Sequence, residues 1–372
     1  MKKLPIILIF LFIVFGIVYF MRDGIMSLFF VAQEPVGVSE GVDSEKVGIE
    51  GSEVVLDNLD IPWEIVFLPG GEMIVTERPG NVLLVSISKE RYVIDEVRHI
   101  GEGGLLGMAL HPEFEDNGYL YLYMTTDNDN RVVRYRFKDG ELLRDRTIIE
   151  NIPMARFHNG GRIKFGPDGY LYITTGDAQN TSLSQDRNSL VGKILRITAE
   201  GLVPEDNPFG NEVYSYGHRN PQGITWDDEG RLWSTEHGPS ARDELNLIKV
   251  GNNYGWPEIV GDEEREGMVT PVLHSGDDYT WAPGGAIFWD GSIFFTGLRG
   301  SAVYEVKLEG GEVVDPLIHF REDFGRIRTI KEGPDGMFYL LTNNTDGRGS
   351  PEVDDDKLIR IDPRVFRDVS NE

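Results

Sequence analysis

The sequence contains no cysteine among its 372 residues. A disulfide framework and a metal site built on thiolates are therefore excluded, whereas an extracytoplasmic location is not. Basic residues are also scarce, because 36 Lys and Arg stand against 62 Asp and Glu and give a formal net charge of −26. A nucleic-acid partner would need a basic surface, so this balance argues against one. The charge favours solubility and a neutral or cationic substrate.

The N-terminus differs from the rest of the chain. Lys2 and Lys3 precede an apolar stretch over residues 4–21, and no small-residue cleavage site follows it. Because this length is near the lower limit for spanning a bilayer, we expect residues 1–23 to form an uncleaved membrane anchor, with a cleaved secretory signal as the alternative. The lysines would stay inside and place the domain outside, with membrane contact through this segment only. Residues 24–51 lack a clear period and predict a flexible tether.

The rest of the chain has no long helical period, and short alternating strands dominate it. A Gly-rich turn followed by such a strand recurs six times, and the turn glycines are Gly71, Gly118, Gly169, Gly230, Gly291 and Gly336. Their spacing of 45 to 61 residues is close to the length of a propeller blade. The pattern predicts an all-β, six-bladed β-propeller over residues 52–366, followed by a short tail over residues 367–372. The strand from Ser52 is expected to complete the sheet that the strand from Lys357 begins.

One run of sequence places a histidine and an aspartate at the ends of neighbouring predicted strands. It is FHNGGRIKFGPDGYLYITTGD, in which His158 precedes an Asn-Gly-Gly turn and Asp177 ends the second strand. Such a pair suits proton abstraction from a hydroxyl, with the carboxylate orienting the imidazole. The alternative is structural: His158 would cap a turn and Asp177 would bond loop backbone. The run alone leaves both interpretations open.

Further segments gather polar residues next to glycines. In chain order they are GHRNPQG from Gly217, EHGP from Glu236, NYGWP from Asn253, APGGAIF from Ala282 and GRIRTI from Gly325. Together with the histidine run, they resemble the soluble pyrroloquinoline quinone (PQQ)-dependent glucose and aldose sugar dehydrogenases, over roughly residues 54–362. The propeller of that family agrees with the six repeats. The resemblance implies oxidation of the C1 hydroxyl of an aldose to the lactone, with hydride transfer to PQQ and with calcium as a second cofactor.

PQQ carries three carboxylates, and arginine binds carboxylates in a bidentate manner. Arg326 and Arg328 are two residues apart, so on a strand their side chains point the same way. They match the paired cofactor arginines of the family, although their spacing alone also allows solvated surface residues. The resemblance implies further cofactor contacts from Asn220 and from Arg299, which stands where the family often has a lysine.

The resemblance also implies two calcium ions, which take oxygen ligands. The carbonyls of Gly238-Pro239 would hold the ion that polarises the quinone as a Lewis acid, although this pair alone also fits a plain turn. Glu244 and the carbonyl of Tyr254 match the ligands of a structural ion, with an acid among residues 262–264 as a further candidate. We expect Glu244 and Tyr254 to lie in a long excursion between strands that has few apolar anchors.

The reaction roles follow from the same resemblance. His158 matches the general base, which takes the proton of the anomeric hydroxyl while hydride leaves C1 for C5 of the quinone. The intrinsic pKa of histidine suits this role. Asp177 matches the acid that supports the base, and Arg219 matches the residue that neutralises developing negative charge. His237 lies near the expected metal. Four further histidines are expected to be turn or surface residues: His99, His111, His274 and His319.

One residue departs from the family pattern. Glu102, in GEGGLLG, stands where the best-known glucose enzymes have a glutamine that contacts the cofactor. A carboxylate beside a tricarboxylate quinone is repulsive unless it is protonated or paired, so Glu102 either weakens cofactor binding or is compensated by a nearby arginine. The loops around the funnel are short compared with the glucose-specialised members, which favours a broad aldose preference.

Two other classes of function remain as alternatives. A calcium-dependent lactonase or esterase can use the same fold, because fold does not settle function. Such a hydrolase would hold calcium by side-chain carboxylates and amides and would not need Arg219, Arg326 and Arg328. A noncatalytic extracellular binding module would need neither these arginines nor the His158–Asp177 pair.

Overall fold

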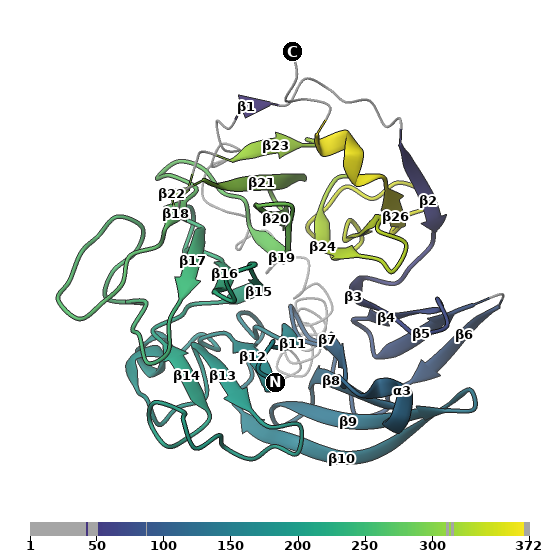
Figure 1. Cartoon of the computed structure of the whole chain (residues 1–372), viewed down its shortest axis with the longest axis horizontal. Helices are drawn as coiled ribbons and strands as arrows, with labels where there is room; N and C mark the ends of the chain where they lie inside the picture. Colours follow the sequence, from purple (N-terminus) through teal and green to yellow (C-terminus); the bar gives the residue numbers. More distant parts are fainter. Residues whose placement is uncertain (1–41, 44–50, 87, 310–311, 314–315, 368–372) are drawn as a thin grey trace, which may run out of the picture.

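The computed structural model describes residues 42–43, 51–86, 88–309, 312–313 and 316–367. Within these residues, six antiparallel sheets surround a central axis (Figure 1), so the prediction of a six-bladed β-propeller is confirmed. The expected anchor, residues 1–23, lies outside the described residues, as do most of the expected tether and tail. No helix in the described part of the chain is long and apolar enough to cross a membrane.

Each blade runs from an inner strand at the axis to an outer strand at the rim (Figure 1). The blades comprise β3 (Pro62–Phe67), β4 (Met73–Glu77), β5 (Asn81–Val85) and β6 (Lys89–Val93); β7 (Leu105–Leu110), β8 (Tyr119–Thr125), β9 (Asn130–Lys138) and β10 (Glu141–Ile152); β11 (Ile163–Phe165), β12 (Leu171–Thr175), β13 (Lys193–Ile197) and β14 (Val213–Tyr216); β15 (Pro221–Trp226), β16 (Leu232–Glu236), β17 (Glu244–Ile248) and β18 (Leu273–His274); β19 (Pro283–Trp289), β20 (Ser292–Gly297), β21 (Ala302–Glu309) and β23 (Leu317–His319); and β24 (Ile327–Glu332), β25 (Phe338–Thr342), β26 (Leu358–Ile361) and β2 (Ser52–Leu56).

The remaining elements are short. Two strands extend the blade of β19: β22 (Glu312–Val313) pairs with β21, and β1 (Val42–Asp43) pairs in parallel with β23. The helical segments are α3 (Phe114–Asn117) and the 3-10 turns η1 (Thr181–Gln185) and η2 (Pro363–Phe366). Regular helix therefore plays almost no part in the described fold.

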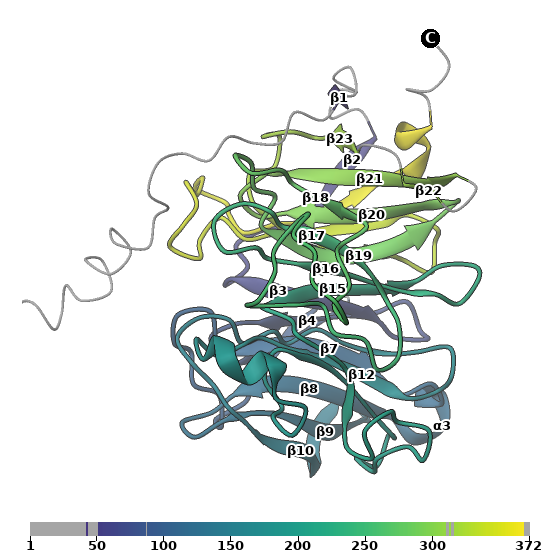
Figure 2. The same ribbon diagram turned by 90° about the vertical axis from the view of Figure 1, so that its left-hand side faces the viewer.

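The two ends of the domain share one sheet. The N-terminal strand β2 pairs antiparallel with β26, and Ser52 lies opposite Ile361. Figure 2 shows the purple β2 beside the yellow C-terminal strand. The expected joining of the ends is confirmed, and radial closure leaves no large open sheet edge between the first and last blades.

The six turn glycines define one face of the ring. All six have positive φ, between 68° and 85°, a conformation that glycine adopts without steric cost. Their turns join the first and second strands of each blade. Because these strands are antiparallel, each inner strand begins, and each second strand ends, on the opposite face. We call that opposite face the funnel face; it carries the segments 98–104, 156–161, 177–179, 217–220, 237–243, 298–300, 324–326 and 343–348.

A second repeat emerges at the end of each second strand. A buried threonine occupies its last or next-to-last position in every blade: Thr76, Thr125, Thr175, Thr235, Thr296 and Thr342. The Thr76 hydroxyl donates to the carbonyl of Leu106 at 2.7 Å, and that of Thr235 donates to the carbonyl of Gly284 at 3.0 Å. Both acceptors lie in the adjacent blade, so these hydroxyls link neighbouring blades. Apolar clusters fill the space between blades elsewhere.

Candidate active site

His158 and Asp177 are in direct contact on the funnel face. His158 Nδ1 lies 2.8 Å from a carboxylate oxygen of Asp177, which is fully buried. The backbone N–H of Gln179 and the indole N–H of Trp256 also donate to this carboxylate, at 2.8 and 2.9 Å. Burial raises the pKa of Asp177, but His158 and these donors together hold it below its usual value, so the group stays ionised. Because the ionised Asp177 can only accept a hydrogen bond, Nδ1 of His158 must carry the hydrogen. In the neutral imidazole, Nε2 then keeps its lone pair.

The loop that carries His158 packs closely against the loop that carries Asp177. His158 has a φ of 62°, in the left-handed region. A Cβ on Gly176 would lie 2.0 Å from the carbonyl oxygen of His158. The backbone N–H of Ala178 donates to that same oxygen at 3.1 Å. The glycine before Asp177 thus permits the close approach of the histidine loop.

Glu102 contacts the histidine loop as well. One of its carboxylate oxygens accepts the backbone N–H of His158 at 2.9 Å, and the other accepts a hydrogen bond from Arg348 Nη1 at 2.7 Å. Burial raises the pKa of Glu102, but Arg348 and His158 together hold it well below its usual range. Of the two alternatives, the structure supplies the nearby arginine, which comes from the segment after β25.

Arg219 and Asn220 directly precede β15 and contact the loops just described. The Arg219 carbonyl accepts the backbone N–H of Asp177 at 2.7 Å, and the Asn220 side-chain oxygen accepts that of Gly160 at 3.0 Å. The Arg219 guanidinium lies 5.3 Å from the centroid of the Trp256 ring. Its buried Nε has no hydrogen-bond partner among the described residues. Arg219 thus has unused donor capacity beside the histidine pair.

Arg326 and Arg328 both contact Asn343, although Arg326 directly precedes β24 and only Arg328 lies within the strand. Arg326 Nε donates to the backbone carbonyl oxygen of Asn343 at 3.3 Å. Arg328 Nη2 donates to the side-chain oxygen of Asn343 at 3.4 Å. Arg326 also pairs with the buried Asp346 at 2.8 Å. Burial, followed by the charges of neighbouring arginines, lowers the pKa of Arg328 to about 9. Neither Arg328 nor the partly buried Arg299 has an ion pair with another described residue.

Asp243 holds the Gly238-Pro239 turn after β16. One oxygen of this buried carboxylate accepts the backbone N–H of Gly238 at 2.8 Å. The other accepts the Thr280 hydroxyl and the backbone N–H of Trp281, both at 2.6 Å. A Cβ on Gly238 would lie 2.0 Å from the carbonyl oxygen of Ala241. The turn therefore requires glycine and has a fixed orientation.

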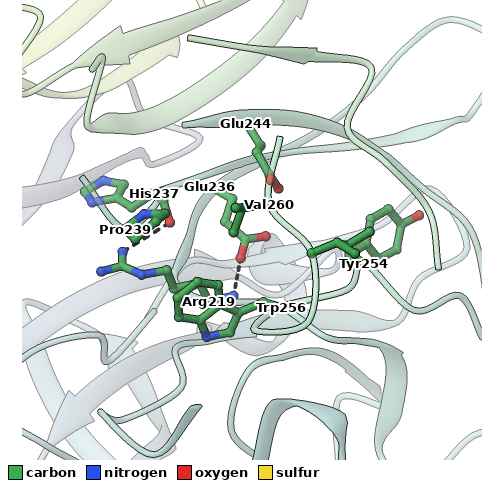
Figure 3. Close-up of a pocket in the computed structure, with 10 residues that line it drawn as sticks. Arg219, Glu236, His237, Pro239, Glu244, Tyr254, Trp256 and Val260 are labelled. Carbon is green, nitrogen blue, oxygen red and sulfur yellow. Dashed lines mark hydrogen bonds between the residues drawn. The ribbon is translucent and has the colours of Figure 1, made fainter. Parts of the chain in front are cut away.

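A small polar pocket lies beside this turn (Figure 3). Its volume of about 10 Å³ is close to the minimum that accommodates one water-sized species. The lining includes Arg219, Glu236, Pro239, Glu244, Tyr254 and Trp256. Figure 3 shows the ring of Tyr254 directed away from Glu236 and Glu244, and its hydroxyl donates to the carbonyl of Leu247 at 2.7 Å.

Two carboxylates meet at this pocket. Glu236 and Glu244 lie directly opposite each other on β16 and β17, a placement that is unfavourable when both are charged. Glu236 is bonded to His218 Nδ1 at 2.8 Å, whereas Glu244 accepts from Asn246 at 3.0 Å and from a backbone N–H at 3.3 Å. Burial, followed by the charge of Glu236, raises the pKa of Glu244 to about 8. A cation in the pocket would favour the charged form of Glu244 and so offset this rise of its pKa.

Two expectations about these residues are wrong. Glu244 does not lie in a loop excursion, because it begins β17. Tyr254 is 4% exposed and packs in an apolar cluster with Tyr172, so its segment has an apolar anchor of its own. His319 is not a surface residue either: it is 3% exposed and lies 3.0 Å from the buried Glu305.

Two of the three further candidate acids contact basic side chains. Asp262 lies 2.9 Å from His274 Nε2, and Glu263 lies 3.2 Å from Arg242 Nη1. In the described part of the chain, no group of three or more His, Asp or Glu side chains is arranged to hold a metal ion. Backbone carbonyls would therefore have to contribute to any calcium site here, as the sequence resemblance implies.

Sequence reasoning missed five residues of the site: Glu236, Asp243, Trp256, Asp346 and Arg348. Glu236 and Trp256 lie in the EHGP and NYGWP motifs and Asp243 follows EHGP by four residues, so motif position could have identified them. The last two lie in an ordinary Gly-rich loop. Arg348 contacts a residue 246 positions away, and no local pattern announces such a contact.

Fold and site together define a propeller protein whose funnel face combines a histidine–carboxylate pair with partly unsatisfied arginines. The chain belongs to the Glucose / Sorbosone dehydrogenase family, which it matches over residues 59–360. The family resemblance stated from the sequence motifs is confirmed.

Similar proteins span nearly the same length. A putative oxidoreductase (glucose dehydrogenase) of Thermus thermophilus is 42% identical, covers 83% of this chain and 99% of its own, and superimposes with a TM-score of 0.80. The PQQ-bound aldose sugar dehydrogenase of Streptomyces coelicolor is 39% identical, covers 84% and 97%, and has a TM-score of 0.78. An aldose sugar dehydrogenase of Escherichia coli is 30% identical over 84% of this chain and 92% of its own.

Proposed function

We propose that this protein is a PQQ- and calcium-dependent aldose dehydrogenase that oxidises the C1 hydroxyl of an aldose to the lactone. The observation that carries the proposal is the ionised Asp177 at 2.8 Å from His158, on a face that also presents arginines with free donors. Family membership and the PQQ bound by the Streptomyces relative support the cofactor. Two aldose sugar dehydrogenases among the relatives support the substrate class.

The residues present fit an anionic quinone. Arg219 and Arg328 each have a buried Nε without a partner among the described residues. Burial and neighbouring cations lower the pKa of Arg328, and a carboxylate beside it would offset both effects. Arg299, Arg326 and Asn220 belong to the same face and are the other proposed contacts.

The residues also fit calcium at two places. The carbonyls of the Gly238-Pro239 turn, whose orientation Asp243 fixes, are proposed to hold the ion next to the cofactor. Glu244 and the Tyr254 carbonyl are proposed to hold a structural ion, because a cation there would offset the repulsion between Glu236 and Glu244 that raises the pKa of Glu244. When bound, PQQ accepts the hydride and calcium makes the quinone more electrophilic.

The side chains of this protein would then divide the remaining work. His158 Nε2 takes the proton of the C1 hydroxyl, while Asp177 keeps the hydrogen on Nδ1 and stabilises the imidazolium that forms. Arg219, stacked on Trp256, stabilises negative charge that develops during the reaction. Because Trp256 also fixes Asp177, the imidazole is oriented before a sugar binds.

The site argues against the two alternatives. A calcium-dependent lactonase or esterase has no use for partly unsatisfied arginines on the funnel face, and a noncatalytic module has no use for a buried carboxylate that orients a histidine. A dehydrogenase with an anionic cofactor and a general base uses both features.

Reconstitution tests the proposal. Purified protein is stripped with a chelator, loaded with PQQ and calcium, and assayed for dye reduction with several aldoses. We expect activity only when PQQ and calcium are both present, and with more than one aldose. Full activity with a nicotinamide cofactor after exhaustive chelation, or no activity after loading, would reject the proposal.

We further propose that the domain works outside the cytoplasm. The support is the basic and then apolar sequence of residues 1–23. Cell fractionation with N-terminal sequencing of the mature protein tests this. Intact protein in the membrane fraction is expected; an intact chain confined to the cytosol would contradict the proposal.

A further inference from the structure

A continuous series of polar contacts links a proposed cofactor arginine to the proposed base. Arg326 pairs with Asp346 at 2.8 Å, and Asp346 also accepts the backbone N–H of Arg348 at 2.9 Å. Arg348 donates to Glu102 at 2.7 Å, and Glu102 accepts the backbone N–H of His158 at 2.9 Å. These contacts join segments from the last blade and from the second and third blades across the funnel face.

Glu102 adds negative charge where an anionic cofactor is proposed to bind. Its charge also acts on Arg219 and on His237, the residue before the Gly238-Pro239 turn. An uncompensated carboxylate at this place would repel a tricarboxylate quinone. Within the described residues, Arg348 is the one cationic side chain that hydrogen-bonds the Glu102 carboxylate.

Glu102 also has a mechanical role that a neutral apolar residue could not fill. His158 adopts a left-handed φ, which a non-glycine residue maintains only when its surroundings enforce it. The N–H···O bond to Glu102 is one of the contacts that enforce it. The two carboxylate oxygens of Glu102 let it bond His158 and Arg348 at the same time.

We propose that Arg348 is a positioning residue of the dehydrogenase site: it neutralises Glu102, so that this carboxylate can hold the backbone of His158 without repelling the quinone. The inference rests on the proposed function. Arg348 acts through Glu102 and not on the reacting atoms. Glutamine at position 102 would hold the same N–H without a charge and would make Arg348 unnecessary.

A double-mutant cycle on quinone affinity tests the charge role. PQQ is titrated into the calcium-loaded, quinone-free protein, and binding is followed by absorbance without any turnover. Arg348→Gln should weaken PQQ binding roughly 5- to 30-fold, and the loss should shrink in high salt. Glu102→Gln should bind PQQ at least as tightly as the natural protein. The double variant should stay within about threefold of Glu102→Gln, because no charge then needs neutralising.

The positioning role has a separate readout. At saturating PQQ and sugar, Glu102→Ala should lower kcat about tenfold, since the N–H of His158 loses its acceptor. Glu102→Gln keeps an acceptor oxygen and should retain most of the kcat. Melting temperatures of all variants establish that they are folded. Equal turnover of the Ala and Gln variants would overturn this part of the proposal.

A matched pair elsewhere serves as the control. Arg144 bonds Glu96 at 2.6 Å with side chains that are 41% and 35% exposed, comparable with 42% and 23% for Arg348 and Glu102. Arg144→Gln should change neither PQQ affinity nor kcat. Unchanged PQQ affinity in Arg348→Gln would overturn this inference and leave the proposed function standing. The same holds if the double variant loses as much PQQ affinity as Arg348→Gln does. Failure of the natural protein to bind PQQ would overturn the proposed function and, with it, the inference.

Discussion

His158 is held by three contacts that involve different parts of the residue. Asp177 binds its imidazole, Glu102 accepts its backbone N–H, and Ala178 donates to its carbonyl oxygen. A left-handed backbone at a non-glycine residue costs of the order of 1 kcal/mol or more, so these contacts must offset strain. The position of the base is thus set by the backbone as much as by the side chain.

Replacing His158 by Ala should remove the base and leave the cofactor contacts in place. We expect kcat to fall by roughly two to four orders of magnitude, the usual contribution of a general base. PQQ affinity should change little. Steady-state dye reduction and a PQQ titration check the two statements, and near-normal turnover would remove His158 from the mechanism.

Arg326 and Arg328 should differ when each is replaced by Ala. Arg328 has no carboxylate partner among the described residues, so its loss should weaken PQQ binding by about 1.5–3 kcal/mol. Arg326 already pairs with the buried Asp346, so its loss should weaken PQQ binding less and also lower the melting temperature. PQQ titration and thermal unfolding of both variants check this. Unchanged half-saturation in Arg328→Ala would mean that it does not contact the cofactor.

The site could be predicted from the sequence only where its residues are close along the chain. His158 and Asp177 lie in one run, with a turn and two strands between them, so their meeting followed from the topology of a hairpin. Trp256 reaches Asp177 across 79 positions and Arg348 reaches Glu102 across 246. Such contacts depend on how blades are arranged around the ring, which a single sequence does not show.

At the scale of elements, β16 and β17 place Glu236 and Glu244 directly opposite each other. A cation that binds only the folded state stabilises it, by about 2.7 kcal/mol at a hundredfold excess over Kd. Chelation should therefore lower the melting temperature even without PQQ. Above about pH 8, where Glu244 is charged, Glu244→Gln removes one opposed charge, so the calcium-free protein should become more stable while the calcium effect shrinks. A melting temperature insensitive to chelator and to calcium would exclude a structural ion here.

The inner strands bring cations together near the axis. Burial, followed by the charge of Lys331, lowers the pKa of Lys164 to about 7, below the value of about 10.4 in an unfolded chain. Between these values the unfolded state binds more protons, so the free energy of unfolding rises with pH. Lys164→Met should stabilise by roughly 1 kcal/mol at pH 6.5, a discounted value because Lys164 is only half-buried.

The gain from Lys164→Met should vanish above about pH 11, where both states of the natural protein carry an uncharged lysine. Urea unfolding at the two pH values measures it. Lys138→Met, at an exposed position on β9, is the control and should show no comparable pH dependence. An equal gain at both pH values would contradict the assigned cause.

Strand existence and blade number could be predicted because the turn glycines recur at regular spacing. The repeated buried threonines at the ends of the second strands were equally visible in the sequence, but their meaning depends on contacts such as Thr235 to Gly284 in the next blade. The segment around Tyr254 was misjudged for the same reason. Its apolar anchors come from neighbouring strands and not from its own sequence.

At the scale of the whole molecule, β2 closes the ring by pairing with β26. A chain that begins at Asp57 lacks β2, so the edge of β26 loses its backbone partners and the buried Leu56. We expect its melting temperature to fall by roughly 5–10 °C, with self-association through the exposed edge. A chain that begins at Gly51 keeps β2 and is the control. Thermal unfolding and size-exclusion chromatography compare the two, and equal behaviour would show that β2 is dispensable.

The pairing of Ser52 with Ile361 also sets an order of events during synthesis. More than 300 residues separate these partners, whereas most other strand pairs join neighbours along the chain. The earlier blades can therefore form while the ribosome is still translating, but β2 must wait until the last strand emerges. Until then the nascent ring has an open seam at its first and last blades. Translation that stops before residue 358 would leave that seam open for good.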